Sequence, residues 1–447
     1  MNKKIALTLG VITFLSLISL ALVNGQTTTT SGSTWPMFHA GVTTATGPTA
    51  NQVVWNYTTH GAMWSSPAVA DSLLFTGSYD RQVYALNAMT GSLVWNFTTG
   101  SAIDSSPAVS NGVVYVGSND NNLYALNETN GILIWNYSTG KQVQSSPVVA
   151  NGVVYVGSND DNLYALNAAT GTREWNFTTG GDVISTPAVA NGVVYFGSYD
   201  HKVYALDAAT GNQLWNFTTG SVVESSPAIA NGVLYIGSYD NNTYALSAST
   251  GTKVWSVSTG YDLCVQASPV VDNGIVYTGG SYNGFIYAYN VTDGSVVWSY
   301  NATPAAPPGP VGIESSTGIY SAPAVAGNVV YVTAFNNTYA LDAATGKLAW
   351  TFETNGVLYS SPAVANGLVY VDSYDHNIYA IGSSTPTPTL TPTPAFTPVP
   401  TPEPTSTPTS TVAPAAPPNY TAYIIVAVVV IVAVAVAAGV LLGKRHK

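Results

Sequence analysis

Eight tryptophans recur along most of the chain at a nearly constant spacing. The first six lie forty residues apart, and the last two follow after 43 and 52 residues. They are Trp55, Trp95, Trp135, Trp175, Trp215, Trp255, Trp298 and Trp350. A repeat of about 40 residues with several turn signals is typical of propeller blades, each of which is one small β-sheet. This period constrains the fold more than any other feature of the sequence.

One repeat, residues 105–140, contains four β-rich runs. Asn-Gly separates the first two runs, an Asn/Asp cluster separates the next two, and a turn ending in glycine precedes the last. Asn-Gly between apolar runs predicts a hairpin whose two turn residues take positive φ. Both faces of Val113–Gly117 and Leu133–Tyr137 carry apolar residues, as expected for a blade packed on neighbours on both sides.

Counting repeats gives eight blades. They begin near Ser65, Ser105, Ser145, Ser185, Ser225, Ala267, Ser321 and Ser360. The eighth repeat supplies only three strands, and Gln52–Thr58 supplies the missing outer strand from the other end of the chain. We therefore expect an all-β fold, an eight-bladed propeller of four-stranded antiparallel blades. An N-terminal strand closes the ring and removes the exposed sheet edges.

The charge distribution argues against one class of partner. Only 7% of the residues are charged, and the formal net charge is −11. All twenty-two acidic residues but only six of the eleven basic ones lie between the two apolar end segments, which gives that part a charge of about −16. Negative charge repels the phosphate backbone, so we expect no nucleic-acid binding.

The two ends of the chain carry targeting signals. Lys3 and Lys4 precede an apolar run and predict a signal peptide over residues 1–25, with an uncleaved anchor as the alternative. Near the other end, residues 421–443 carry no charge and predict a transmembrane helix, because Ala422–Gly443 would span about 33 Å. The basic residues 444–447 then form a cytoplasmic tail.

The remaining segments complete the organisation. Residues 26–50 are a lead-in, residues 51–383 form the propeller, and residues 384–420 are a Thr/Pro-rich stalk. Alternating Thr-Pro favours extended polyproline-II structure and resembles O-glycosylated stalks. We expect a single-pass cell-membrane protein on the surface of a prokaryote such as an archaeon, whose monomeric propeller lies outside the cell.

A recurring motif carries a family resemblance. Ala85–Trp95, ALNAMTGSLVW, resembles the tryptophan-docking motif of PQQ-like (quinoprotein dehydrogenase-like) propeller repeats, roughly A-x-D-x-x-T-G-x-x-x-W. Six related segments end at later tryptophans, and Trp35–Gly41 is similar to the family's lead-in. The resemblance covers about residues 52–382 and implies an eight-bladed propeller. We interpret the eight tryptophans as structural docking residues and not as a stack for a cofactor.

The resemblance leaves both enzymes and binding modules open. Quinoprotein dehydrogenases carry an adjacent Cys-Cys pair against the quinone and a Ca²⁺ site beside a catalytic Asp, whereas this chain has Cys264 alone. The sequence contains neither a phosphate-binding glycine loop nor a nucleophile elbow. We therefore expect no catalytic residues and no cofactor, whether PQQ or Ca²⁺.

Six acids repeat at one position, in the turn between the second and third strands of a blade. They are Asp80, Asp120, Asp160, Asp200, Asp240 and Asp375. The connections between blades add Asp104, Asp182, Glu224 and Asp262 on the same face. These acids are weak candidates for a cation-binding ring, and the alternative is that Asp favours the turn through local hydrogen bonds. His201 and His376 follow the turn acid in two opposite blades, which argues against a shared metal site.

Departures from the repeat are the better candidates for a binding site. Two connections between blades are irregular, Tyr261–Gln266 and the Pro-containing insertion Asn301–Tyr320. Long loops on a rigid scaffold commonly carry binding specificity.

The sequence also contains possible N-glycosylation sites, several of them directly after a docking tryptophan. They are Asn56, Asn96, Asn127, Asn136, Asn176, Asn216, Asn241, Asn290, Asn301, Asn336 and Asn419.

These features together predict a membrane-anchored propeller that acts as a binding, adhesion or scaffold module, without catalytic activity. Its partner is an unidentified extracellular protein or glycan. One alternative is a PQQ- or metal-dependent dehydrogenase. Another is an envelope assembly scaffold similar to the bacterial outer-membrane barrel-assembly propeller, against which the lack of a lipid-accepting cysteine argues.

Overall fold

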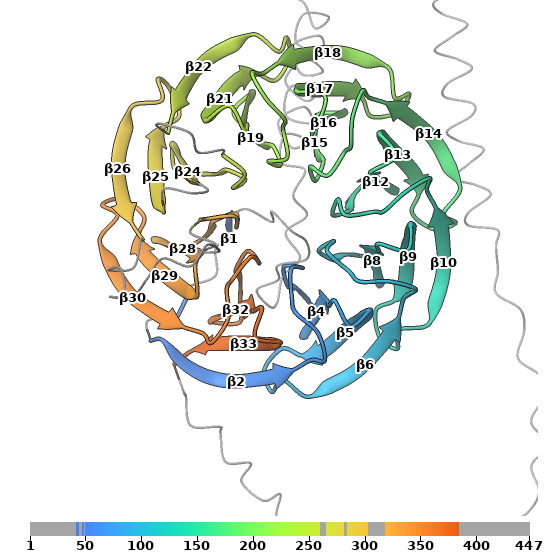
Figure 1. Cartoon of the computed structure of the whole chain (residues 1–447), viewed down its shortest axis with the longest axis vertical. Coiled ribbons are helices and arrows are strands. Elements are labelled where there is room, and N and C mark those ends of the chain that lie inside the picture. The colour runs from blue at the N-terminus through green and yellow to red at the C-terminus, as the bar shows by residue number, and fades with distance from the viewer. Residues whose placement is uncertain are drawn as a thin grey trace, which may run out of the picture. The chain divides into compact units, whose positions relative to one another are not determined.

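The computed structural model describes residues 42–43, 47–48, 50–259, 265–280, 284–302 and 318–383. These residues form 33 β-strands arranged as eight sheets around a ring (Figure 1). Seven sheets have four strands and one has five, and the four successive strands of each blade pair antiparallel. The eight-bladed architecture expected from the tryptophan spacing is confirmed.

Each blade runs from the centre of the ring to its rim. The first, innermost strands are β3 (Ala68–Ala70), β7 (Ala108–Ser110), β11 (Val148–Ala150), β15 (Ala188–Ala190), β19 (Ala228–Ala230), β23 (Val270–Asp272), β27 (Ala324–Ala326) and β31 (Ala363–Ala365). The second strands are β4 (Leu73–Gly77), β8 (Val113–Gly117), β12 (Val153–Gly157), β16 (Val193–Ser198), β20 (Val233–Gly237), β24 (Ile275–Gly279), β28 (Val329–Ala334) and β32 (Leu368–Asp372).

The third strands are β5 (Gln82–Asn87), β9 (Asn122–Asn127), β13 (Asn162–Asn167), β17 (Lys202–Asp207), β21 (Asn242–Ser247), β25 (Phe285–Asn290), β29 (Asn337–Asp342) and β33 (Asn377–Gly382). The outer strands of blades one to seven are β6 (Leu93–Thr98), β10 (Leu133–Ser138), β14 (Arg173–Thr178), β18 (Gln213–Thr218), β22 (Lys253–Ser258), β26 (Val296–Asn301) and β30 (Leu348–Glu353). The outer strand of blade eight comes from the other end of the propeller.

That strand is β2 (Gln52–Thr58), which pairs antiparallel with β33. Gln52 lies opposite Gly382, and Thr58 lies opposite Asn377. Figure 1 shows the blue β2 along the outside of the red-orange blade eight. The predicted closure by Gln52–Thr58 is therefore confirmed, and it gives the third strand of blade eight a partner for its free edge.

A short strand before β2 adds a feature that the sequence did not predict. Strand β1 (Val42–Thr43) pairs in parallel with β27, so blade seven has a fifth strand on the inner side of the ring (Figure 1). Between β1 and β2, the side-chain amide of Asn51 donates a hydrogen bond of 2.7 Å to the carbonyl of Thr351. The lead-in motif Trp35–Gly41 lies outside the described residues.

The turns between the first two strands have the predicted geometry. In blade two the φ of Asn111 is +52° and that of Gly112 is +76°, and the Asn-Gly pairs of five other blades repeat this pattern. Both residues must be left-handed in a type I′ turn, whose twist matches that of the flanking strands. The Asn-Gly dipeptide therefore fixes the inner hairpin locally in these six blades.

The core lies between neighbouring blades. In one cluster, Tyr115 and Trp135 of blade two pack with Val154, Tyr164 and Leu166 of blade three, and all five are buried. Apolar residues on both faces of the middle strands account for this packing, since each blade covers the next one.

Several predicted segments lie outside the described residues. They are the signal peptide, the stalk, the apolar segment 421–443 and the basic tail. Among the residues that are described, no helix has the length and hydrophobicity needed to cross a bilayer.

Candidate functional site

One face of the ring is built from two kinds of loop. The turns between second and third strands and the connectors from each outer strand to the next inner strand emerge at the same ends of the antiparallel strands. We call this surface the turn face. It carries the repeated acids, and its middle is hollowed.

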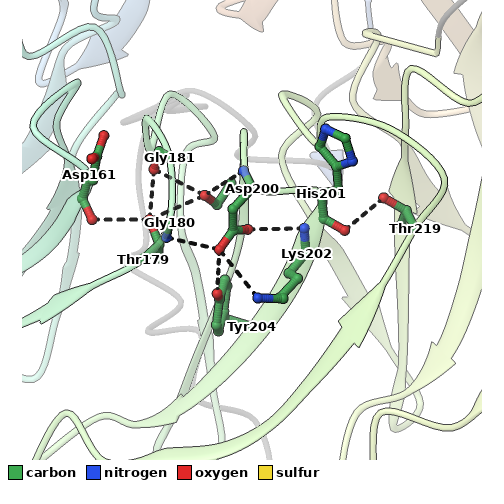
Figure 2. Close-up of polar contacts among 10 residues, drawn as sticks. Asp161, Thr179, Gly180, Gly181, Asp200, His201, Lys202, Tyr204 and Thr219 are labelled. Carbon is green, nitrogen blue, oxygen red and sulfur yellow. Dashed lines mark hydrogen bonds and ion pairs between the residues drawn. The ribbon is translucent and has the colours of Figure 1, made fainter.

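Asp200 of blade four shows what the repeated acids do (Figure 2). Its Oδ1 accepts a hydrogen bond of 3.1 Å from the amide of Lys202. Its Oδ2 accepts bonds from the hydroxyl of Tyr204, at 2.5 Å, and from the amide of Gly180, at 3.0 Å. Gly180 belongs to the connector from the preceding blade, so the carboxylate fastens that connector to the turn.

The same three acceptor contacts recur at the other five acids. Each Oδ1 accepts the amide two residues later, and each Oδ2 accepts a connector amide and the hydroxyl of the tyrosine four residues later. The acids are Asp80, Asp120, Asp160, Asp240 and Asp375. Burial, followed by the neighbouring Asp, raises the pKa of the tyrosine, to about 12 for Tyr379. The carboxylate oxygens of the six acids therefore already accept hydrogen bonds within the fold. This is what we expect if Asp is present because it favours the turn through local hydrogen bonds.

The residue after each turn acid has a positive φ, in the left-handed region of backbone conformation. His201 and His376 occupy this position, with φ values of +70° and +72°. The carbonyl of His201 accepts a bond of 3.0 Å from the hydroxyl of Thr219, which ties the turn to the outer strand (Figure 2). Within the described ranges, no three His, Cys, Asp or Glu side chains come together as a metal-binding group.

The tryptophans join each blade to the next. Trp95 donates its indole N–H to the carbonyl of Glu128, at 2.8 Å, and its ring lies against Gly131. A Cβ on Gly131 would stand 2.6 Å from the Trp95 ring, and the φ of this glycine is +70°. The glycine of the docking motif therefore packs against the tryptophan of the preceding blade. This close packing requires glycine in addition to the positive φ of the turn.

The hollow in the turn face is a cavity of about 130 Å³ at the centre of the ring, which we call the central depression. Seven hydroxyl residues line its wall. They are Ser66, Ser106, Ser146, Thr186, Ser226, Ser268 and Ser361. The amide of Ser66 donates to the hydroxyl of Ser106 at 2.9 Å, and similar bonds link other neighbouring blades. This hydroxyl ring ties the inner ends of the blades together.

A second ring of residues around the central depression varies from blade to blade. It consists of Trp64, Asp104, Gln144, Ile184, Glu224, Gln266, Tyr320 and Tyr359. We call these eight residues the variable ring. Each follows a fully buried apolar residue, such as Ile103, and precedes a buried Ser or Ala, such as Ser105. The backbone position is thus repeated while the side chain changes.

One side of the variable ring is aromatic. Trp64 stacks on Tyr359 with ring centroids 4.4 Å apart, and on its other neighbour Tyr79 at 6.2 Å. Tyr320 and Tyr374 contact Tyr359 at 5.4 and 5.8 Å. Trp64 is 39% exposed, although its partners are in contact with it on two sides. An exposed, pre-ordered aromatic surface is suited to contact with a ligand.

The other side of the variable ring carries carboxylates and carboxamides. Asp104 Oδ2 accepts bonds of 2.9 Å from the side-chain amides of Asn119 and Gln144. Glu224 accepts from Gln266 at 2.7 Å, and from two tyrosine hydroxyls described below. Burial, followed by a hydrogen bond to Asp104, raises the pKa of Tyr79.

The sequence identified only part of this site. The sequence predicts Asp104 and Glu224 as connector acids and places Gln266 and Tyr320 at the ends of the two candidate loops. It does not single out the other members of the variable ring, which are Trp64, Gln144, Ile184 and Tyr359. The available signal was the residue before the repeated Ser-Ser, which reads W, D, Q, I, E, Q, Y, Y around the ring. The predicted loops reach the same place, because Gln266 and Tyr320 end them. Residues 260–264, with Asp262 and Cys264, and residues 303–317 lie outside the described residues.

The residues of the central depression do not fit pyrroloquinoline quinone. This cofactor is a tricarboxylate, and its negative charge requires compensating positive charge at the site. The described lining residues include Asp104 and Glu224 but neither Lys, Arg nor His.

Comparison with known proteins places the chain among propellers of this architecture. Residues 39–147, 101–186, 139–222 and 179–387 match the profile of the family described as outer membrane protein assembly factor BamB. The matches span most of the chain, which therefore belongs to the PQQ-like, BamB-type β-propeller repeat family. A search of curated proteins gave no match.

Solved structures share the fold at low identity. The chain is similar to BamB from Moraxella catarrhalis, with a TM-score of 0.62, 19% identity and coverage of 74% of this chain and 98% of that one. It is also similar to the computationally designed Ika8 protein, with a TM-score of 0.65, 15% identity and coverage of 74% and 100%. A europium-containing methanol dehydrogenase gives a TM-score of 0.64, 14% identity and coverage of 76% and 89%. At these identities the likeness shows the fold.

Proposed function

We propose that the chain is a cell-surface binding module whose ligand site is the central depression, and that it has no catalytic activity. The variable ring carries this proposal. Eight connectors share one backbone position and one set of buried neighbours, yet they present eight side chains of mixed chemistry to one cavity. A purely structural position in this repeat would take one residue type, as the docking tryptophans do.

The proposed setting follows from the ends of the chain. A signal peptide, a Thr/Pro-rich stalk and an apolar anchor would present the propeller outside the cell membrane. The exposed Asn side chains at 56, 96, 136, 176 and 216 would then put glycans on the outer strands. Such glycans would lie at the rim, away from the central depression.

The test measures the binding of the purified full-length chain to a defined array of extracellular proteins and glycans. We expect at least one ligand whose binding is lost in Trp64→Ala and Glu224→Gln. Asp293→Asn, an exposed acid in the turn between β25 and β26 on the opposite face, should bind like the wild type. Binding that none of the depression variants changes, or no binding at all, would refute the site. Alcohol oxidation after addition of PQQ and Ca²⁺ would refute the non-catalytic assignment.

A scaffold role in a cell envelope is a second candidate, because the matching family is described by outer-membrane assembly. Exposed apolar residues at the start of β10 favour it, since Ile132 is 64% exposed and Ile134 is 46% exposed. A partner that docks on this rim would be lost in Ile132→Asp and retained in Trp64→Ala. The opposite result supports the central depression.

A further inference from the structure

We infer that the central depression binds an organic cation with a primary ammonium group, either a free amine or a lysine side chain of a partner. This inference rests on the proposed function, since it names the ligand chemistry of the same site. It follows from three properties of the variable ring, namely its charge, the direction of its hydrogen bonds and its aromatic side.

The charge of the lining is uncompensated. Asp104 and Glu224 contribute two carboxylates, and the described residues that line the cavity include no basic side chain. Among the described residues the ion pair found is Lys202 with Asp200, at 3.8 Å in a turn and not in the cavity. A concave acidic surface of this kind concentrates cations.

The hydrogen bonds around Asp104 point toward its carboxylate, because an ionised carboxylate can only accept hydrogen bonds. Asp104 orients the amide nitrogens of Gln144 and Asn119 toward itself, each at 2.9 Å. The oxygen of Gln144 then accepts the amide of Asn159 at 2.8 Å. This series of hydrogen bonds ends in oxygen atoms that accept none. They are the Oδ1 atoms of Asp104, Asn119 and Asn159, which are buried without a hydrogen-bond partner in the described part of the chain.

Glu224 orders its neighbours in the same way. It accepts the hydroxyl of Tyr199 at 2.7 Å, that of Tyr239 at 2.5 Å and the amide of Gln266 at 2.7 Å. The donor hydrogens of these bonds are therefore committed to the carboxylate. A ligand that supplies hydrogen-bond donors fits the remaining acceptors better than one that needs donors from the protein.

The aromatic side provides the complementary contact. Trp64 presents 39% of its surface and is held in place by Tyr359 at a centroid distance of 4.4 Å. The face of an indole ring attracts ammonium groups, more strongly where water is excluded. The same ring would also stack on a sugar, but a neutral sugar would leave both carboxylates without a counter-charge. The cavity, at about 130 Å³, also suits an alkylammonium head better than a large ring system.

Calorimetric titration of the full-length protein tests the inference with two amine probes and two neutral ones. The amines are 1,5-diaminopentane and a peptide with a single internal lysine. The neutral probes are 1,5-pentanediol and glucose. We expect saturable binding of at least one amine, weakened by salt, and none of the neutral probes. Which amine binds more tightly distinguishes a free amine from a protein lysine as the source.

Two variants remove the proposed contacts. Asp104→Asn keeps the size of the side chain but removes the charge, and Trp64→Ala removes the aromatic surface. Each should weaken amine binding by about tenfold or more. Asp293→Asn removes one acid from the opposite face and should leave affinity unchanged. If Trp64→Ala unfolds, Glu224→Gln replaces it, with thermal unfolding of every variant as the folding control.

The outcomes separate this inference from the proposed function. Binding of glucose that depends on Trp64, without amine binding, would overturn the cation and retain the depression as a site. Amine binding that is equal in Asp104→Asn and wild type would also overturn the cation site. If no probe binds and the depression variants keep every ligand found on the array, the inference and the proposed function both fail.

Discussion

Trp350 donates its indole N–H to the carbonyl of Pro48, 302 residues earlier in the chain, at 3.3 Å. In the other blades the corresponding acceptor belongs to the next docking motif, as Ala168 does for Trp135. Blade eight has no such motif after its third strand. The segment before β2 therefore takes the place of the eighth motif, and closure of the ring involves a tryptophan contact in addition to the pairing of β2 with β33.

This relationship predicts that the two tryptophans at the ring closure, Trp55 and Trp350, contribute unequally to the free energy of unfolding. Trp55 is buried and donates to Ala88 of blade one at 2.9 Å, whereas Trp350 is only half-buried. Trp55→Ala should lower the free energy of unfolding by about 3–5 kcal/mol, and Trp350→Ala by about 1–3 kcal/mol. Denaturant unfolding of both variants measures the difference. Equal costs would mean that the Pro48 segment packs as tightly as a full docking motif.

Glycine has two roles in the repeat, to adopt a positive φ and to pack against a tryptophan. Two glycines with similar φ values allow these roles to be measured separately. Gly131 has a φ of +70° and lies against Trp95, while Gly152 has a φ of +79° with nothing within 4 Å of an added Cβ. Gly152→Ala should cost about 1 kcal/mol through backbone strain alone. Gly131→Ala adds a steric clash and should cost about 2–4 kcal/mol in total. Equal unfolding free energies for the two variants would contradict the packing role of Gly131.

The fold could be predicted because its signals are local and repeated. A tryptophan about every forty residues, Asn-Gly at the inner hairpins of six blades and the unpaired run Gln52–Thr58 each specify one part of the ring. Strand β1 could not be predicted, because two residues carry no usable periodicity and their parallel partner Val325–Ala326 lies far away in sequence.

The site was harder to predict for a different reason. The acids that repeat most regularly, such as Asp160, are the most conspicuous candidates in the sequence, but their oxygens accept hydrogen bonds within the fold. Trp64 and Tyr359 come from opposite ends of the propeller sequence and meet only because the ring closes. No spacing along the chain shows that contact.

The hydrogen bonds of the turn acids predict that these residues do not bind metal ions. Asp160 accepts hydrogen bonds from the amides of Gly140 and Asn162 and from the hydroxyl of Tyr164. Asp160→Ala should therefore lower the free energy of unfolding by about 2–3 kcal/mol, because three donors lose their acceptor. Millimolar Ca²⁺ should leave the Tm of the wild type unchanged. A rise in Tm with Ca²⁺ that Asp160→Ala abolishes would instead support the acidic ring as a cation site.

A buried carboxyl at the closure seam predicts a pH dependence of stability. Asp372 ends β32 at the position where blades one to six have glycine, and it is fully buried. Its Oδ2 accepts a hydrogen bond from the hydroxyl of Thr76 in blade one, while its Oδ1 has no partner among the described residues. Burial raises the pKa of Asp372 to about 8, and the bond from Thr76 opposes this shift.

The sign follows from proton binding. Between its ordinary pKa of 3.8 and about 8, the folded protein keeps the proton on Asp372 that the unfolded chain releases. The contribution of Asp372 to stability is therefore greatest below that ordinary pKa and declines as the pH rises through about 8. Asp372→Asn cannot ionise, so its Tm should lie closest to that of the wild type near pH 3 and rise above it progressively toward pH 9. Thermal unfolding of both proteins across this range measures the difference, and a difference in Tm that stays constant with pH would show that Asp372 does not titrate in the folded protein.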